Sequence, residues 1–156
     1  MRAGGRWHTA GRAVVYTAEH PALALVEAIV HLELDSVSGV PAHYQLLEID
    51  VPEKSPREIV KAPLLGDKWA NEIARTRAIG DRWLREGRTA LLVVPSTVVP
   101  NSQNWLINPA HADAARLRIV GVTKYPFDVR LVRGSVSRSR PRSECLRSDQ
   151  PSLGAC

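Results

Sequence analysis

Residues 4–33 read GGRWHTAGRAVVYTAEHPALALVEAIVHLE, and this stretch predicts a glycine-rich loop, a strand and a helix in that order. The run AVVYT at 13–17 is β-branched and aromatic, which is typical of a strand. Pro21 then stands where a helix would begin, because proline is well tolerated at the first helical position. Apolar side chains recur at helical spacing through 22–34, so we expect a helix there.

Outside this stretch, the chain alternates between short apolar runs and polar turns. We expect further strands at 43–51, 90–94, 104–106, 116–122 and 127–132. We also expect a helix at 67–85 that Gly87 ends, a short helix at 108–115 and a loop at 55–65. Because helices and strands mix without strict βαβ alternation, the sequence predicts an α+β fold with a mixed, mostly antiparallel sheet and flanking helices.

Composition narrows the class of protein. The chain has 156 residues, of which 44% are hydrophobic and 24% charged, and this suits one soluble globular domain. No apolar run reaches the roughly 18 residues of a membrane span, and 1–12 lack a secretory signal, so we expect no membrane partner. The two cysteines, Cys145 and Cys156, are too few for a disulfide scaffold or a cysteine zinc site, and indicate a reducing, cytoplasmic setting.

The charge pattern limits the partners. The net charge is +5, but no dense Lys/Arg face with interleaved aromatic side chains occurs, so direct nucleic-acid binding is not expected. Residues 134–156 are rich in Ser and Arg and predict a disordered tail, with an arginine-rich arm on nucleic acid as the alternative. The five histidines are not at metal-ligand spacing and no H-E-x-x-H occurs, so no metal site is predicted. The sequence also contains no Walker loop and no G-x-G-x-x-G motif for nucleotide phosphates.

Glu27 is the most informative single residue, since it stands within an otherwise apolar helical stretch. Its carboxylate either faces solvent or lies in a cavity with a cationic partner or a ligand that develops positive charge. Ser96 directly follows a buried-type strand, and Asn104 lies a few residues on; each could contact a ligand or stabilise a turn. No nucleophile elbow surrounds Ser96, so a serine nucleophile is not expected.

The loop and the first strand offer further candidates. Arg6 follows two glycines that allow close approach, and its guanidinium could bind phosphate or carboxylate as a fork, or stay solvated. Trp7 could stack on a base or pack in the core. Tyr16 shares a strand face with Val14, so it could be a core tyrosine or could stack on an aromatic ligand.

Taken in order, these residues resemble the RES domain family, which is named for an Arg, a Glu and a Ser. The matching elements are G-R-W at 5–7, Tyr16, Glu27, Pro-Ser at 95–96 and N-W-L-x-N-P at 104–109. The resemblance predicts a RES domain at 1–133, followed by the tail at 134–156.

The resemblance implies a fold like that of the ADP-ribosyltransferases and a toxin of a bacterial toxin–antitoxin pair. Such toxins consume NAD⁺ with water, phosphate or a protein as acceptor, so NAD⁺ is a substrate and no cofactor is expected. The implied protein partner is an Xre-like antitoxin, in an oligomeric complex. By position, the residues expected at the NAD⁺ site are Arg6, Trp7, Tyr16, Glu27, Ser96, Asn104 and Trp105, with catalysis by Glu27, Arg6 and Tyr16.

One departure from the family concerns the start of the chain. RES proteins usually carry a W-R-I strand before the G-R-W motif, and this sequence has none there, so we expect the domain to lack that strand. Two other function classes therefore stay open. The chain could be a catalytically impaired RES protein that only binds its antitoxin, or a basic nucleic-acid-binding protein.

Overall fold

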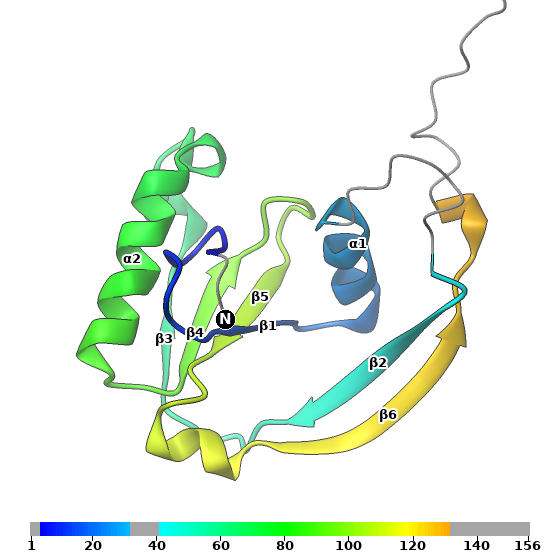
Figure 1. The fold of residues 1–156 in the computed structure, drawn as a ribbon. Coiled ribbons are helices and arrows are strands. Elements are labelled where there is room, and N and C mark those ends of the chain that lie inside the picture. Colours follow the sequence, from blue (N-terminus) through cyan, green and yellow to red (C-terminus); the bar gives the residue numbers. More distant parts are fainter. Residues whose placement is uncertain (1–3, 32–40, 132–156) are drawn as a thin grey trace, which may run out of the picture.

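The computed structural model describes residues 4–31 and 41–131, so the predicted tail at 134–156 lies outside the described residues. Four strands form the central sheet in the order β1-β5-β4-β3 (Figure 1). Their bounds are Val15–Ala18 for β1, Gln103–Ile107 for β5, Leu91–Pro95 for β4 and Arg57–Ile59 for β3. Only the β3–β4 pair is parallel among the described pairs, which confirms the α+β class and the mostly antiparallel sheet.

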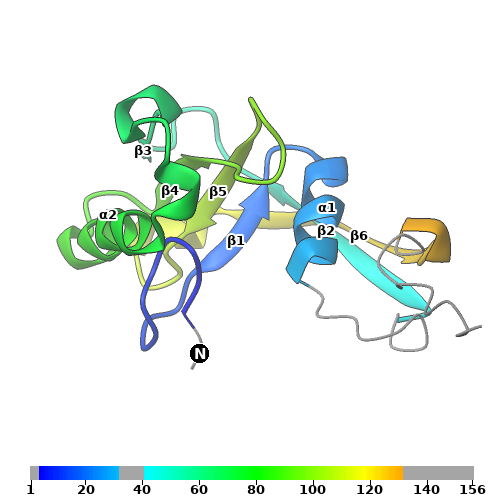
Figure 2. The ribbon, with the colours of Figure 1, turned by 90° about the horizontal axis from the view of Figure 1, so that it is seen from above.

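Two helices and a separate ribbon surround this sheet. Helix α1 (Pro21–His31) follows β1 directly. Helix α2 (Ile73–Glu86) ends at Gly87, which adopts a left-handed conformation and whose N–H donates to the carbonyl of Trp83. Strands β2 (His43–Asp50) and β6 (Arg118–Pro126) pair into an antiparallel ribbon that runs beneath the sheet and past α1 (Figures 1 and 2). Short 3₁₀ turns lie in these connections, among them η2 (Ala62–Leu65), η3 (Trp69–Asn71) and η4 (Ala112–Arg116).

The central sheet is buried on both faces. Every second side chain along β4 and β5 faces α2. Those of Leu92, Val94 and Leu106 pack there in a core that includes Trp83. The intervening side chains point to the other face and pack with residues of the β2–β6 ribbon and η4. Burial on both faces explains why β4 is a continuous apolar run rather than an alternating one.

The N-terminal loop docks on α2 through a contact that requires glycine. A Cβ at Gly80 would lie 1.7 Å from the carbonyl oxygen of Trp7, so only a residue without a side chain lets the loop approach the helix this closely. One turn before it, the Thr76 hydroxyl donates to the Arg6 carbonyl at 2.8 Å. Helix α2 therefore fixes where the G-R-W segment lies.

The Gly80→Ala substitution should destabilise the fold by at least about 2 kcal/mol, because the clash involves backbone and cannot relax by a rotamer change. Denaturant unfolding measures this loss. The exposed α2 residue Arg82 provides the control, since Arg82→Ala should change stability by no more than about 0.5 kcal/mol. An unchanged unfolding midpoint for Gly80→Ala would show that the loop does not dock here.

Three predicted elements were wrong or incomplete. The segment 55–65, predicted as a loop, contains β3 and η2. Strand β3 forms through backbone pairing with β4. Its sequence did not predict a strand, because two of its three residues are charged. The strand predicted at 127–132 is instead a 3₁₀ turn, η5 (Val129–Leu131), because the Asp128 carboxylate accepts from the Arg130 N–H at 2.9 Å and closes a turn. The helix predicted at 67–85 begins only after η3, at Ile73.

Candidate active site

Glu27 extends from α1 to the sheet rather than into solvent. Its side chain is 18% exposed. Its Oε1 accepts a hydrogen bond from Ser96 Oγ at 2.8 Å and another from Asn104 Nδ2 at 2.6 Å. Ser96 follows β4 and Asn104 lies in β5, so this one carboxylate oxygen joins α1 to the end of the β4–β5 pair.

The second carboxylate oxygen of Glu27 is left open. Among the described residues it makes no hydrogen bond and one ion-pair contact, with His31 Nε2 at 3.9 Å, and that histidine side chain is 78% exposed. A carboxylate oxygen can accept two hydrogen bonds, so Oε2 is available to a hydroxyl or to a positive charge on a ligand. One oxygen thus fixes the group while the other stays free for chemistry.

Ser96 supports the carboxylate. Its buried hydroxyl donates its one proton to Glu27 and accepts from the N–H groups of Val98 and Val99, at 3.1 and 3.0 Å. These bonds use its donor and both lone pairs. The residue therefore orients Glu27 and shapes the turn after β4, which agrees with the absence of a nucleophile elbow.

Tyr16 lies on the same sheet face as Asn104. It pairs with Leu106 in β5, two residues from Asn104, and diagonal neighbours of this kind are roughly 7–8 Å apart. The residue is 40% exposed, while its hydroxyl accepts from the Trp7 N–H at 3.1 Å and contacts His8 Nδ1 at 2.9 Å. Burial of the hydroxyl raises the pKa of Tyr16 above 10.0, against a smaller lowering by the Trp7 bond, so the phenol keeps its proton at neutral pH.

His8, behind that phenol, is only 2% exposed. Burial lowers the pKa of His8 below 6.5, nearby Asp81 opposes this shift and Arg77 adds to it. The unfolded chain therefore binds a proton at this side chain at a higher pH than the folded chain does. The stabilisation from neutral His8 is complete above pH 6.5 and is lost as the pH falls below that value.

We expect the free energy of unfolding to decline as the pH falls below about 6.5, and the decline to be shallower for His8→Asn. Urea unfolding at a series of pH values measures both slopes. His43→Asn, at an exposed residue of β2, should keep the slope of the unmodified chain. Equal slopes for His8→Asn and the unmodified chain would contradict this account of His8.

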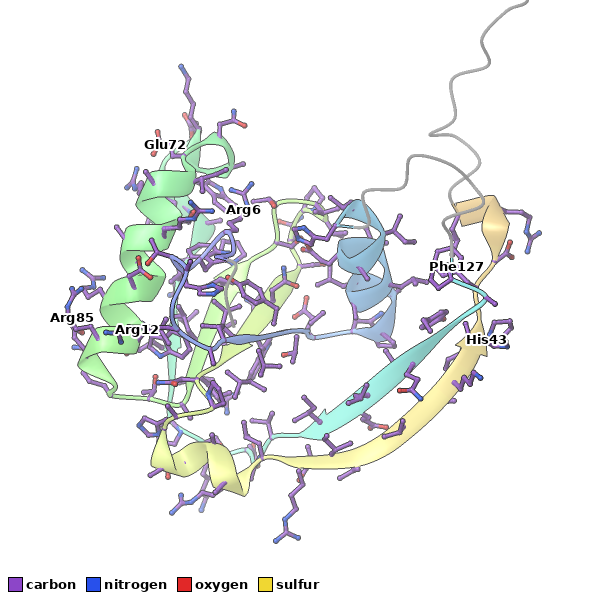
Figure 3. The ribbon with its side chains drawn as sticks, viewed as in Figure 1. Arg6, Arg12, His43, Glu72, Arg85 and Phe127 are labelled. Carbon is purple, nitrogen blue, oxygen red and sulfur yellow. The ribbon has the colours of Figure 1, made fainter. Side chains whose placement is uncertain are left out.

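Arg6 is a half-buried cation without an anionic partner among the described residues. Its Nη1 donates to the carbonyl of Ala70 at 2.8 Å, and its Nε and Nη2 groups have no hydrogen-bond partner within 4–31 and 41–131. Figure 3 shows it on the N-terminal loop, between α2 and the strands. A guanidinium with free donors and no carboxylate is suited to bind a phosphate or carboxylate ligand.

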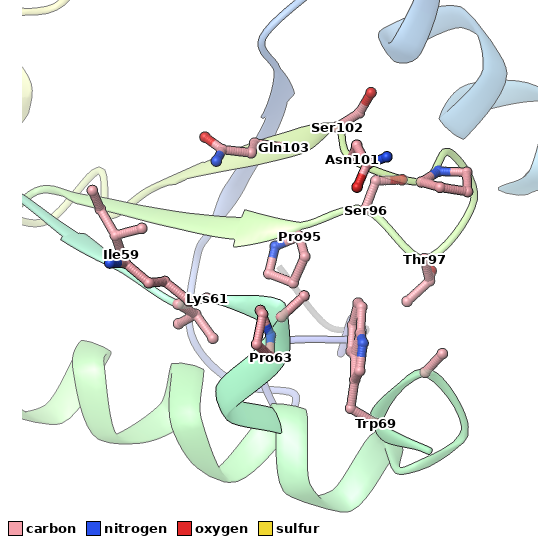
Figure 4. A pocket seen from close by; sticks show the side chains of 14 residues that line it. Ile59, Lys61, Pro63, Trp69, Pro95, Ser96, Thr97, Asn101, Ser102 and Gln103 are labelled. Atoms are coloured by element: carbon pink, nitrogen blue, oxygen red, sulfur yellow. The ribbon is translucent and has the colours of Figure 1, made fainter. Parts of the chain in front are cut away.

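A pocket of about 770 Å³ lies beside this region, between η2, η3 and the β4–β5 turn, and neither Glu27 nor Arg6 is among its lining residues. Its lining includes Ser96, which binds Glu27, and Ala70, which binds Arg6. Trp69, on η3, lies on the opposite side of the pocket from the β4–β5 turn, and its ring points toward Thr97 of that turn (Figure 4). The volume lies within the range of ordinary small-molecule sites, roughly 300–1,000 Å³.

Of the predicted site residues, only Ser96 and Asn104 bond to Glu27; Arg6, Tyr16, Trp7 and Trp105 make no hydrogen bond or ion pair with it. Trp7 is buried in the α2-side core, where its ring lies 6.1 Å from that of Trp69. Trp105 lies on the opposite sheet face from Asn104, beneath the guanidinium of Arg57 at 5.0 Å. The sequence does not distinguish Trp69 as a site residue, because its spacing also fits the apolar face of the helix predicted at 67–85.

No three side chains of His, Cys, Asp or Glu gather within 4–31 and 41–131 as metal ligands would. Neither α1 nor α2, the helices of the described part of the chain, has the length and apolarity to cross a membrane.

Comparison with known proteins identifies relatives over most of the chain. The family model described as RES domain matches residues 1–130. A Prs ADP-ribosylating toxin from Sphingobium sp. is 41% identical over 134 residues, which are 83% of this chain and 81% of that protein. A protein named Toxin Res from Pseudomonas putida is 39% identical over 119 residues, 76% of this chain and 80% of that protein. Another Toxin Res, from Photorhabdus laumondii, is 34% identical over 133 residues and covers 83% of each chain.

Proposed function

This chain belongs to the RES domain family, and from that premise we propose that it is a bacterial toxin that cleaves the nicotinamide–ribose bond of NAD⁺. The observation that carries the proposal is the Glu27 carboxylate, with one oxygen bound by Ser96 and Asn104 and the other open. The relative named as an ADP-ribosylating toxin supports NAD⁺ as the substrate class.

The charge changes during bond cleavage suit a fixed carboxylate. As the bond breaks, its electron pair moves to the pyridinium nitrogen, so nicotinamide leaves neutral and needs no acid. Positive charge then builds on the ribose ring, as in glycoside hydrolysis. Glu27 Oε2 would stabilise that charge and accept from a ribose hydroxyl, while Oε1 stays bound to Ser96 and Asn104.

The other predicted residues would bind the rest of the dinucleotide. The free donors of Arg6 would bind the diphosphate, whose oxygens a guanidinium can contact in pairs. The half-exposed ring of Tyr16 would stack on a flat ring of the substrate. NAD⁺ would be a substrate that is consumed, so the reaction needs no separate cofactor.

The acceptor completes the reaction. An oxygen of water or phosphate, or a protein side chain, would form the new bond to the ribose carbon and release its proton to solvent.

A toxin of this kind needs a partner that restrains it, and we propose a cognate antitoxin in an oligomeric complex, in the cytoplasm where NAD⁺ is found. Neither a membrane nor direct contact with nucleic acid is required.

The test is to incubate the purified chain with NAD⁺ and identify the products by mass spectrometry, with and without phosphate and with a cell extract. Free nicotinamide must appear together with ADP-ribose, its 1-phosphate or a modified protein, and these products separate hydrolysis, phosphorolysis and transfer. Intact NAD⁺ in all three arms would overturn the proposal and favour a RES protein that only binds its antitoxin.

A further inference from the structure

We propose that His8 and the Tyr16 hydroxyl form a positioning pair that holds Arg6 in its binding geometry. The inference rests on the proposed function, because it assigns Arg6 to the substrate. It gives the Tyr16 hydroxyl a role separate from that of the Tyr16 ring, and it gives a role to a buried histidine that bond cleavage does not use.

The segment from Gly5 to His8 closes around the Tyr16 hydroxyl. The Gly5 N–H donates to the His8 carbonyl at 3.0 Å and forms a tight turn. Inside it, the Tyr16 oxygen accepts from the Trp7 N–H at 3.1 Å and contacts His8 Nδ1 at 2.9 Å. A Cβ at Gly5 would lie 2.4 Å from that oxygen, so the turn encloses the hydroxyl with no space to spare.

The outer side of the turn is attached to α2. Thr76 Oγ1 donates to the Arg6 carbonyl and Arg77 Nε donates to the Gly5 carbonyl, both at 2.8 Å. The turn is therefore held between β1, which carries Tyr16, and the helix. With its backbone held on both sides, Arg6 reaches the carbonyl of Ala70 at the pocket wall.

His8 is a costly residue to bury unless it performs such a task. Its Nε2 is buried and has no hydrogen-bond partner among the described residues, and an orphaned polar group of this kind is destabilising. An apolar ring of similar size would avoid that cost. What the imidazole adds is the Nδ1 contact with Tyr16, which fixes the turn that carries Arg6.

Binding of ADP-ribose, measured by titration calorimetry, tests this without requiring turnover. His8→Phe should weaken binding about tenfold, as is typical when a group that orients a binding residue is lost. His8→Asn, whose amide can replace Nδ1, should restore most of the affinity. Tyr16→Phe keeps the ring and loses the hydroxyl, so it should match His8→Phe, while His43→Phe on the exposed part of β2 should bind normally.

A double-substitution cycle separates positioning from a general structural effect. In the Arg6→Gln background, His8→Phe should cost little further affinity, because the group that it orients is gone. Equal losses in both backgrounds, or full affinity of the folded His8→Phe chain, would overturn the inference. If the unmodified chain does not bind ADP-ribose at all, the proposed function fails instead.

Discussion

Replacing Glu27 by Gln should lower the rate of NAD⁺ loss by at least about a hundredfold while the chain stays folded. The amide keeps the shape of the side chain and an oxygen that can accept from Ser96 and Asn104. It removes the negative charge that faces the developing positive charge on the ribose. The effect should fall on kcat, because the charge appears only as the bond breaks.

Nicotinamide release from the two chains, followed as an initial rate, measures this effect. Thermal unfolding confirms that the variant is folded. The matched control is Glu86→Gln, a substitution of a carboxylate in the last turn of α2 that pairs with the exposed Arg88. It should leave the rate unchanged, and a Glu27→Gln rate near that of the unmodified chain would remove Glu27 from the mechanism.

Replacing Arg6 by Gln should weaken ADP-ribose binding by about ten- to a hundredfold and raise KM for NAD⁺ with a smaller effect on kcat. A hydrogen bond to a charged group contributes about 1.5–3 kcal/mol, which corresponds to that range of affinity. The diphosphate is equally charged before and during cleavage, so the loss is one of binding. Arg6→Lys should recover only part of it, because an ammonium lacks the fork.

Calorimetry with ADP-ribose and steady-state kinetics with NAD⁺ provide the two measurements. Arg12→Gln is the matched control, since Arg12 lies on the same N-terminal segment and its side chain is exposed (Figure 3). Its affinity should equal that of the unmodified chain. Equal weakening by Arg12→Gln and Arg6→Gln would indicate general attraction by positive charge rather than a specific fork at Arg6.

The sequence predicted the elements of the fold better than their pairing. The strand and helix of 4–33 were evident from residue type and spacing, because both periods are local. The parallel pairing of β3 was not, since its three residues include two charged ones and its partner β4 lies far along the chain. A short strand held by backbone bonds leaves little trace in its side chains.

The candidate site shows the same limit. Glu27 stood out as a carboxylate in an apolar stretch, but its bond to Ser96 spans 69 positions, and no local pattern encodes that distance. Strand alternation alone would have separated Trp105 from Asn104, because neighbouring strand residues face opposite sides. Trp69 could not be found this way, since its place at the pocket depends on how η3 packs against Trp7.

The most direct measurement is a crystal structure of the Glu27→Gln chain with NAD⁺, in which slowed cleavage leaves the dinucleotide intact. We expect the nicotinamide-bearing ribose to lie against the side chain at position 27, with the diphosphate on Arg6. A dinucleotide bound on another face of the sheet, with neither residue in contact, would contradict it.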